Sequence, residues 1–85
     1  MYRIEITPRA EKALKKIPSH IREAIKTKID LLQYFSAQTP QVKTLTGSLR
    51  GYYRLRAGDY RIVFLVRDAV LVIVVIDVFH RGKGY

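Results

Sequence analysis

The segment from Leu49 to Val66 reads Leu-Arg-Gly-Tyr-Tyr-Arg-Leu-Arg-Ala-Gly-Asp-Tyr-Arg-Ile-Val-Phe-Leu-Val. Two alternating runs flank the pair Gly58-Asp59, and this pattern predicts a β-hairpin with a tight turn. A two-residue turn keeps the apolar side chains of both strands on one face, whereas a three-residue turn divides them between the faces. We therefore expect a two-residue turn, with Arg56 directly opposite Arg61.

This register places three arginines, Arg54, Arg56 and Arg61, on one face of the hairpin. Like charges directly across a ladder destabilise a sheet, so the arrangement breaks a local rule and indicates a function. Guanidinium groups that converge on one surface bind phosphate through paired N–H donors. The alternative is that the arginines only solvate one face of an antiparallel sheet.

The composition indicates one small folded domain, residues 1–85, with an acidic partner. Of the 85 residues, 48% are hydrophobic, and 16 Lys and Arg against 7 Asp and Glu give a formal net charge of +9. This charge predicts binding to nucleic acid, an anionic membrane or an acidic protein. The absence of cysteine excludes disulfides and thiolate metal sites and fits a cytoplasmic protein. We expect no signal peptide and no membrane span, because the longest apolar run is far below ~20 residues.

The residues before the hairpin predict one strand and two helices. Tyr2 to Ile6 alternate as in a strand, and Thr7-Pro8 has the sequence of a helix N-cap followed by proline in the first turn. The spacing of the apolar residues predicts one helix to about Ile17 and a second, capped by Ser19, to about Phe35. Together they form an antiparallel helix hairpin that must bury its apolar side on a sheet.

The remaining segments complete the predicted fold. Residues 36–48 show no clear period and are expected to connect the helices to the β-hairpin. A turn at Asp68-Ala69 and a nearly continuous apolar strand, Val70 to Phe79, follow the hairpin. The expected fold class is α+β. An N-terminal strand is followed by an antiparallel helix hairpin, and this hairpin packs on one face of a mainly antiparallel four-stranded sheet.

The last strand brings candidate proton-transfer groups to the arginines. A two-residue turn at Asp68-Ala69 would place Arg61 opposite Ile76 and His80 near the arginine face. Histidine titrates near neutral pH, whereas a guanidinium stays protonated, so His80 is the candidate acid or base. Tyr52 and Tyr85 are candidates for base stacking or proton transfer. The alternative is that the histidine and the tyrosines are ordinary sheet and surface residues.

The same face is predicted to carry an apolar groove beside the arginines, formed by Val63, Leu65, Val74 and Ile76. An apolar groove next to a basic cluster is typical of a docking surface for a partner. No His, Asp and Glu set has the spacing of metal ligands, and no glycine-rich phosphate loop is present. We therefore expect neither a metal nor a cofactor.

These features resemble the RelE/ParE superfamily of toxins from type II toxin–antitoxin systems. The resemblance covers the order of the elements and three motifs, namely Leu45-Thr-Gly-Ser-Leu-Arg-Gly, Tyr53-Arg-Leu-Arg-Ala-Gly-Asp-Tyr-Arg-Ile-Val-Phe, and His80-Arg81 with a terminal tyrosine. It implies a RelE-like mRNA interferase, a metal-independent endoribonuclease that enters the ribosomal A site, cleaves the message and inhibits translation. It also implies a cognate antitoxin, which we expect to be small and net acidic.

The resemblance also implies roles for individual residues. Phosphate contacts fall to Arg54 and Arg56, and the catalytic set is Arg61, His80, Arg81 and Tyr85. Tyr52, named above as a candidate for base stacking, is expected to contact the RNA beside the two arginines. Some relatives carry lysine where the two phosphate-binding arginines stand, and lysine can shift its pKa where arginine does not. Two alternatives stay open: a ParE-like poison of DNA gyrase without nuclease activity, and a nucleic-acid-binding module without chemistry.

Overall fold

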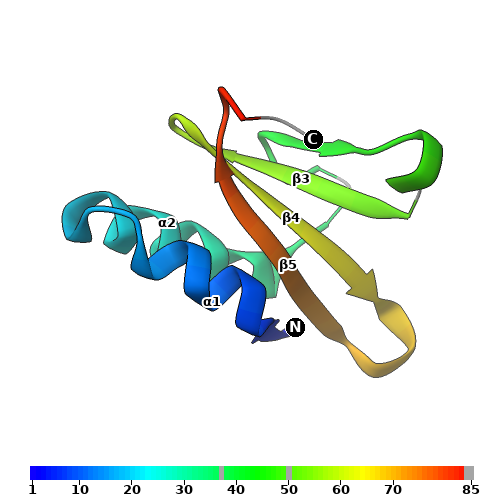
Figure 1. Cartoon of the computed structure of the whole chain (residues 1–85). Coiled ribbons are helices and arrows are strands. Elements are labelled where there is room, and N and C mark those ends of the chain that lie inside the picture. The colour runs from blue at the N-terminus through cyan, green and yellow to red at the C-terminus, as the bar shows by residue number, and fades with distance from the viewer. Residues whose placement is uncertain (37, 50, 84–85) are drawn as a thin grey trace.

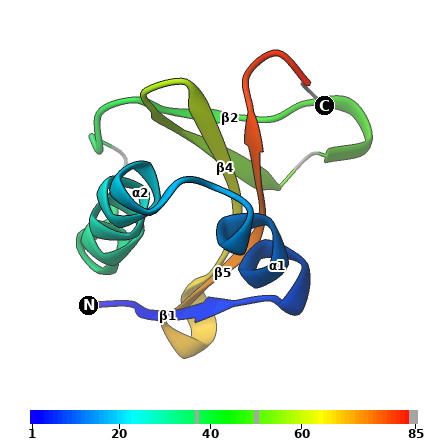
Figure 2. The same ribbon diagram turned by 60° about the vertical axis from the view of Figure 1, so that its left-hand side comes forward.

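The computed structural model describes residues 1–36, 38–49 and 51–83, and within them two helices cover one face of a five-stranded sheet (Figures 1 and 2). The strands are Arg3–Ile6 (β1), Val42–Thr44 (β2), Tyr52–Ala57 (β3), Tyr60–Arg67 (β4) and Val72–His80 (β5). The α-helices are Pro8–Lys15 (α1) and Ser19–Leu31 (α2), and the 3₁₀ turns are Leu32–Tyr34 (η1), Gly47–Leu49 (η2) and Asp68–Val70 (η3).

The strand order is β1-β5-β4-β3-β2, with β1 parallel to β5 and the other pairs antiparallel. The expected fold class is confirmed, and the sheet has one strand more than predicted. The additional strand, β2, lies in the segment expected to be a connector. Its three residues are too few to show a period, and only Val42 packs against the core, while Lys43 and Thr44 are exposed.

The two helices begin differently. Thr7 caps α1 as predicted, because its Oγ1 accepts a hydrogen bond from the backbone N–H of Ala10 at 3.2 Å. The prediction that Ser19 caps α2 is wrong: Pro18 is the N-cap, and its carbonyl accepts hydrogen bonds from the N–H groups of Ile21 and Arg22. Neither helix in the described ranges is long and apolar enough to cross a membrane.

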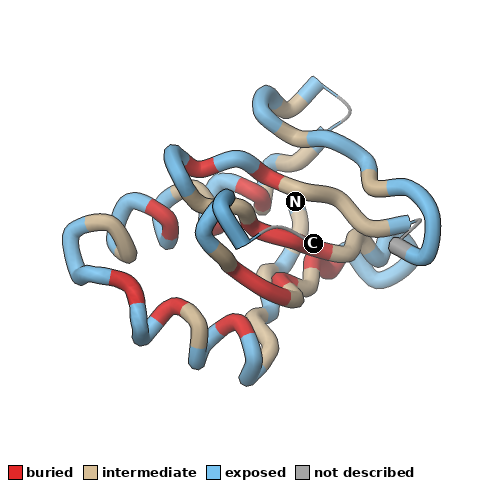
Figure 3. Tube along the Cα trace, turned by 45° about the horizontal axis from the view of Figure 1, so that its top comes forward, coloured by how far each residue is buried: buried red, intermediate tan, exposed pale blue. Residues whose placement is uncertain are grey.

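The core lies between the helix pair and the sheet, where Figure 3 shows the buried residues along the inner sides of both layers. Leu14, Ile25 and Ile29 of the helices share one buried cluster with Phe64 of β4, and all four are at most 2% exposed. Around Phe64, the rings of Phe35 and Tyr53 lie with centroids 5.5 Å away. This aromatic cluster fixes the helix hairpin against β3 and β4.

The β3–β4 hairpin has the predicted register, with Arg56 opposite Arg61 and Ala57 opposite Tyr60. The loop is therefore the pair Gly58-Asp59. Gly58 has φ +59°, whereas Asp59 is not among the residues with positive φ, which is the pattern of a type II′ turn. An L side chain at this first loop position would be strained, so glycine is required there by the turn type.

The predicted register between β4 and β5 is wrong, because Arg61 lies opposite Phe79 and not opposite Ile76. The connection is longer than two residues: η3 is followed by Leu71 in the left-handed region, with φ +54°. A bulge between Val63 and Phe64 then leaves Ile76 as the extra residue of β5. The hydroxyl of Thr7 donates to the Ile76 carbonyl at 2.9 Å, so the cap of α1 also holds the bulge.

Candidate nucleic-acid interface

Four cations from three strands surround one depression of about 280 Å³, which we call the arginine pocket. They are Lys43 on β2, Arg54 and Arg56 on β3 and Arg61 on β4; Gln41 and Val42 complete the lining. The cations form two cross-strand pairs, since Lys43 lies directly opposite Arg54 and Arg56 directly opposite Arg61. The predicted arginine cluster is therefore present, and the added strand contributes a fourth charge.

Among the residues that the structure describes, no carboxylate forms an ion pair with a cation of the arginine pocket. Within the described residues, the ion pairs are Arg3–Glu5, Arg9–Asp77 and Arg81–Asp59, and none of them includes a cation of the pocket. Like charges that face each other without a counter-ion favour an anionic ligand, because binding removes the repulsion.

The turn holds the guanidinium of Arg61 in place. Its Nη1 donates to the carbonyl oxygens of Gly58 at 2.9 Å and Tyr60 at 3.0 Å. Both hydrogen bonds use the same nitrogen, and guanidinium carries five N–H donors, so further donors remain for a ligand. Arg61 is half-buried, which limits the freedom of its side chain. This cation is therefore pre-oriented at the mouth of the hairpin.

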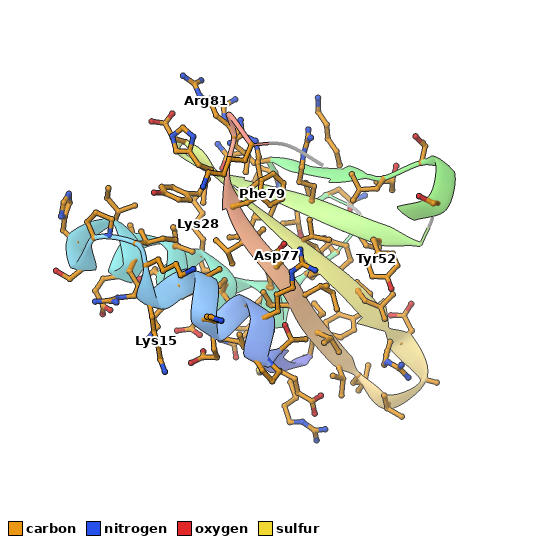
Figure 4. The ribbon with its side chains drawn as sticks, viewed as in Figure 1. Lys15, Lys28, Tyr52, Asp77, Phe79 and Arg81 are labelled. Atoms are coloured by element: carbon orange, nitrogen blue, oxygen red, sulfur yellow. The ribbon has the colours of Figure 1, made fainter. Side chains whose placement is uncertain are left out.

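Arg81 extends the ladder beyond β5. Its backbone N–H donates to the carbonyl of Asp59 at 2.8 Å, and its Nε lies 3.5 Å from the Asp59 carboxylate. Alternation along the strand places Arg81 on the same side as Phe79, which is the partner of Arg61. Figure 4 shows Arg81 at the end of β5, beside the tip of the hairpin.

The structure does not bring His80 to the arginine face, contrary to the prediction. His80 lies opposite Tyr60, and the two rings meet edge to face with centroids 5.3 Å apart. Tyr60 packs against the helix-side core, so His80 begins on the face away from Arg61. The cause is the longer turn and the bulge, which shift β5 along β4. The catalytic role of His80 stays a prediction.

The two predicted tyrosines lie apart from the pocket or outside the described residues. Tyr52 is half-buried opposite Leu65, four residues along β3 from Arg56, a separation of ~13 Å. Figure 4 shows it at the end of the hairpin remote from Arg81. Tyr85 lies outside the described residues.

The predicted apolar groove has fewer accessible residues than expected. Leu65 and Val74 face each other across β4 and β5 and are half-buried. Val63 lies opposite Asp77 and is only 2% exposed, so it offers a partner little surface. Ile76 is half-buried at the bulge. Leu65 and Val74 are therefore the accessible part of this surface.

Lys43 and Gln41 line the arginine pocket, although neither was predicted to be part of the site. Both lie in the segment without a clear period, so no local signal assigned them to a sheet edge. The alternation of Val42, Lys43 and Thr44 is the only trace of a strand, and three residues do not distinguish it from a loop.

Comparison with known proteins identifies the relatives of this chain. Residues 4–85 match the family described as the ParE toxin of the type II toxin–antitoxin system, parDE. The chain is similar to the toxin–antitoxin complex RelBE2 from Mycobacterium tuberculosis, with TM-score 0.81, 28% identity and coverage of 94% of this chain and 98% of that chain. It is also similar to the RelE–RelB complex from Pyrococcus horikoshii, with TM-score 0.78, 30% identity and coverage of 98% of both chains. For the RelB–RelE complex from Methanococcus jannaschii, the TM-score is 0.73 at 31% identity, covering 93% of this chain and 92% of that chain. No curated protein sequence matches the chain.

Proposed function

Since the chain belongs to the ParE toxin family of type II toxin–antitoxin systems, we propose that it inhibits translation as a RelE-like endoribonuclease that cleaves messenger RNA on the ribosome. The archaeal RelE complexes, at 30% and 31% identity, support the RelE-like assignment within the superfamily. The proposal implies a cytoplasmic protein, with ribosome-bound message as its target and a small acidic antitoxin as its partner.

The arginine pocket is the observation that carries this proposal. Lys43–Arg54 and Arg56–Arg61 are like-charged pairs at directly opposed positions, where each pair costs the sheet stability. A purely structural surface has no need of them, because one neutral or acidic residue in each pair would remove the repulsion. Binding of a phosphate that accumulates negative charge during a reaction would explain why these four cations lie together, because all of them can stabilise that charge.

The reaction that fits the pocket is attack by a ribose 2′-hydroxyl on the adjacent phosphate. The 2′-oxygen loses its proton and forms a bond to phosphorus, and the bond from phosphorus to the 5′-oxygen of the next nucleotide breaks. The leaving oxygen takes up a proton, so the products are a 2′,3′-cyclic phosphate and a 5′-hydroxyl. Negative charge builds on the non-bridging oxygens in the transition state, and this charge is what the cations stabilise.

Within this proposal, Arg61 is the main transition-state donor, because the turn already orients its guanidinium. Arg54 and Arg56, with Lys43 beside them, bind the phosphates of the RNA strand, and Tyr52 stacks on a more distant base. Arg81 joins the pocket when its exposed ion pair with Asp59 opens. Oriented donors of this kind need little reorganisation during the reaction.

Proton transfer needs a group other than guanidinium. The candidates are His80 and Tyr85, and the family resemblance favours a C-terminal tyrosine or histidine. Because His80 begins on the face away from Arg61, we assign the larger share of proton transfer to Tyr85. This division is a prediction, which removal of Tyr85 and the variant His80→Ala test.

The antitoxin is proposed to cover the half-buried apolar surface formed by Leu65 and Val74, with Val63 and Ile76 at its border. An amphipathic, net-acidic segment fits this surface, since the cations of the arginine pocket lie on the same side of the sheet. Bound there, an acidic segment would also occupy the pocket and block access of RNA.

Mapping of RNA 5′ ends after induced expression tests the proposed function. Cuts inside translated codons that depend on ribosomes, and that disappear in Arg61→Ala, are the expected result. Uncut messages together with stalled replication would instead identify a gyrase poison. Growth without either effect, but with RNA bound in the cell, would identify a binding module without chemistry.

A further inference from the structure

A second basic cleft lies along the outer edge of β5, outside the arginine pocket. β1 pairs with β5 only as far as Val75, so the part of β5 beyond it faces α1 instead of a strand. The cleft between them has a volume of about 430 Å³. Its cations are Arg9, Lys12, Lys16 and Lys83, against the single carboxylate of Asp77. No residue of this edge cleft belongs to the arginine pocket.

The cations of α1 form a row along the cleft. Arg9, Lys12 and Lys16 follow one another at ~4.5 and ~6 Å along the helix axis. Arg9 marks one end, since its Nε lies 3.2 Å from the carboxylate of Asp77, which is buried and also accepts from the N–H of Val78. The two lysines are exposed, and Lys83, which follows β5, also lines the cleft. A row of point charges fits a chain of phosphates better than one small anion.

The lining favours a polyanion over a protein segment. Of the apolar residues in the cleft wall, Ile17 and Val78 are 7% and 3% exposed, so the accessible apolar surface comes from Ala13 and the half-buried rings of Tyr60 and Phe79. Aromatic rings of this kind stack on bases. Protein interfaces take most of their binding energy from buried anchor side chains, whereas phosphate contacts alone support nucleic-acid binding. An apolar depression beside α2, where Leu31 and Tyr34 are 58% and 64% exposed, lacks this basic row.

One residue connects the edge cleft to the arginine pocket. Phe79 lines the cleft and lies directly opposite Arg61 across the β4–β5 ladder. Cross-strand neighbours are ~5 Å apart. An RNA strand that leaves the cleft over Phe79 therefore meets Arg61 next. Phe79 is half-buried, so part of its side chain is accessible to a base of the RNA.

We propose that the edge cleft binds the backbone of the RNA segment flanking the scissile phosphate, with Phe79 as the crossing point between the two basic surfaces. The inference rests on the proposed function in taking RNA as the ligand. It adds a second, sequence-independent contact, which sets how long an RNA the protein engages and how binding responds to salt.

The test compares two double variants with the same change in charge, both built on Arg61→Ala so that RNA stays intact. Lys12→Gln/Lys16→Gln removes two cations of the cleft. Lys15→Gln/Lys26→Gln removes two exposed cations that do not line it, and Figure 4 shows Lys15 on the outer side of α1. Binding of a fluorescent single-stranded RNA is measured by anisotropy across a salt series, with thermal melting as the check on folding.

The cleft double variant is expected to reduce the slope of log K against log salt by about 1.4, because each lost phosphate contact on a single strand contributes about 0.7. The control should change the slope by less than half as much. Equal changes in both doubles would mean a diffuse positive field and overturn the proposal. An unchanged RNA slope with weaker antitoxin binding would assign the cleft to a protein partner and overturn it too.

Phe79→Leu tests the crossing point separately, since leucine keeps apolar volume in the cleft but removes the ring. We expect about a tenfold loss of affinity for single-stranded RNA, which corresponds to one lost stacking contact. Affinity equal to that of the parent would remove Phe79 from the path. All of these measurements use binding alone, so they stand whether or not the parent protein cleaves ribosome-bound message.

Discussion

Arg81 is held to Asp59 twice, through its backbone N–H at 2.8 Å from the Asp59 carbonyl and through its Nε at 3.5 Å from the Asp59 carboxylate. The first contact is a continuation of the β4–β5 ladder, and the second joins two side chains that are 63% and 62% exposed. The backbone bond therefore fixes where Arg81 stands, while the exposed ion pair can open at little cost. Through this ion pair, Asp59 engages the guanidinium of Arg81, which could otherwise join the cations of the arginine pocket.

Asp59→Asn should release the side chain of Arg81 without harming the fold, since an exposed pair contributes only about 0.2–1 kcal/mol. We expect tighter binding of single-stranded RNA and a salt slope steeper by up to about 0.7, which is one additional phosphate contact. Anisotropy titrations at several salt concentrations measure both. Asp30→Asn, which removes an exposed carboxylate on α2, is the matched control. Equal gains in the two variants would show that net charge alone is responsible.

Arg61→Ala should lower cleavage of ribosome-bound message by about 10²–10³, the cost of losing one oriented donor to the transition state. The protein should stay folded, and relief of the repulsion between Arg56 and Arg61 should raise its melting temperature. A cleavage assay with purified ribosomes and a thermal melt give the two numbers. Arg67→Ala, an exposed arginine of the same strand, should cleave normally. Normal cleavage by Arg61→Ala would reduce the arginine pocket to a solvated surface.

Removal of Tyr85 and His80→Ala should have unequal effects on cleavage. General acid–base help contributes about 10²–10⁴, so loss of Tyr85 should cost that factor while RNA binding is retained. His80 lies against Tyr60 on the other face, so His80→Ala should stay within about tenfold of the parent. Single-turnover cleavage and filter binding at fixed salt separate the two quantities. A hundredfold loss of cleavage rate in His80→Ala, with RNA binding intact, would assign proton transfer to His80 instead of Tyr85.

Leu65→Asp should weaken the complex with the antitoxin more than it disturbs the fold, because Leu65 is half-buried beside Val74 on the outer face of the sheet. A carboxylate there would face an acidic segment and would have to lose its hydration. Calorimetry of the purified pair measures the change in affinity. Leu71→Asp, in the turn after η3 and 51% exposed, is the control. Undiminished affinity in Leu65→Asp would show that the antitoxin binds elsewhere.

Tyr2 should make stability depend on alkaline pH. Its hydroxyl donates a hydrogen bond to the Asp68 carboxylate, and this bond raises the pKa of Tyr2 above its ordinary value. A raised pKa in the folded state means that the stabilisation is complete below about pH 10 and is lost as the pH rises through the folded-state pKa. Tyr2→Phe should therefore be less stable than the parent at pH 8, with the difference shrinking toward pH 11.

Urea unfolding at each pH gives this comparison for Tyr2. Tyr34→Phe, at a tyrosine that is 64% exposed, controls for the general effect of alkali. A difference between Tyr2→Phe and the parent that does not change with pH would show that the hydrogen bond to Asp68 does not govern stability.

Local signals in the sequence determined the α+β class and most elements. Thr7 and Pro8 define the start of α1, and the II′ turn at Gly58 fixes the partners of Arg56 and Ala57, since each depends on neighbours only a few residues away. The same turn made the arginine face predictable. Once the loop length is known, period-two alternation determines on which face of the sheet each side chain of the two strands lies.

Only the tertiary structure decided which residue at the end of β5 lies on the same side of the sheet as the arginines. The turn at η3 and the bulge at Ile76, which the Thr7 hydroxyl holds, shift β5 so that Arg81 and not His80 continues the arginine side. Likewise, Lys43 joined the pocket through a strand whose only support is its pairing with β3. These pairings join segments far apart in the chain, and a slip of one residue moves a side chain to the other face, so composition and periodicity leave them open.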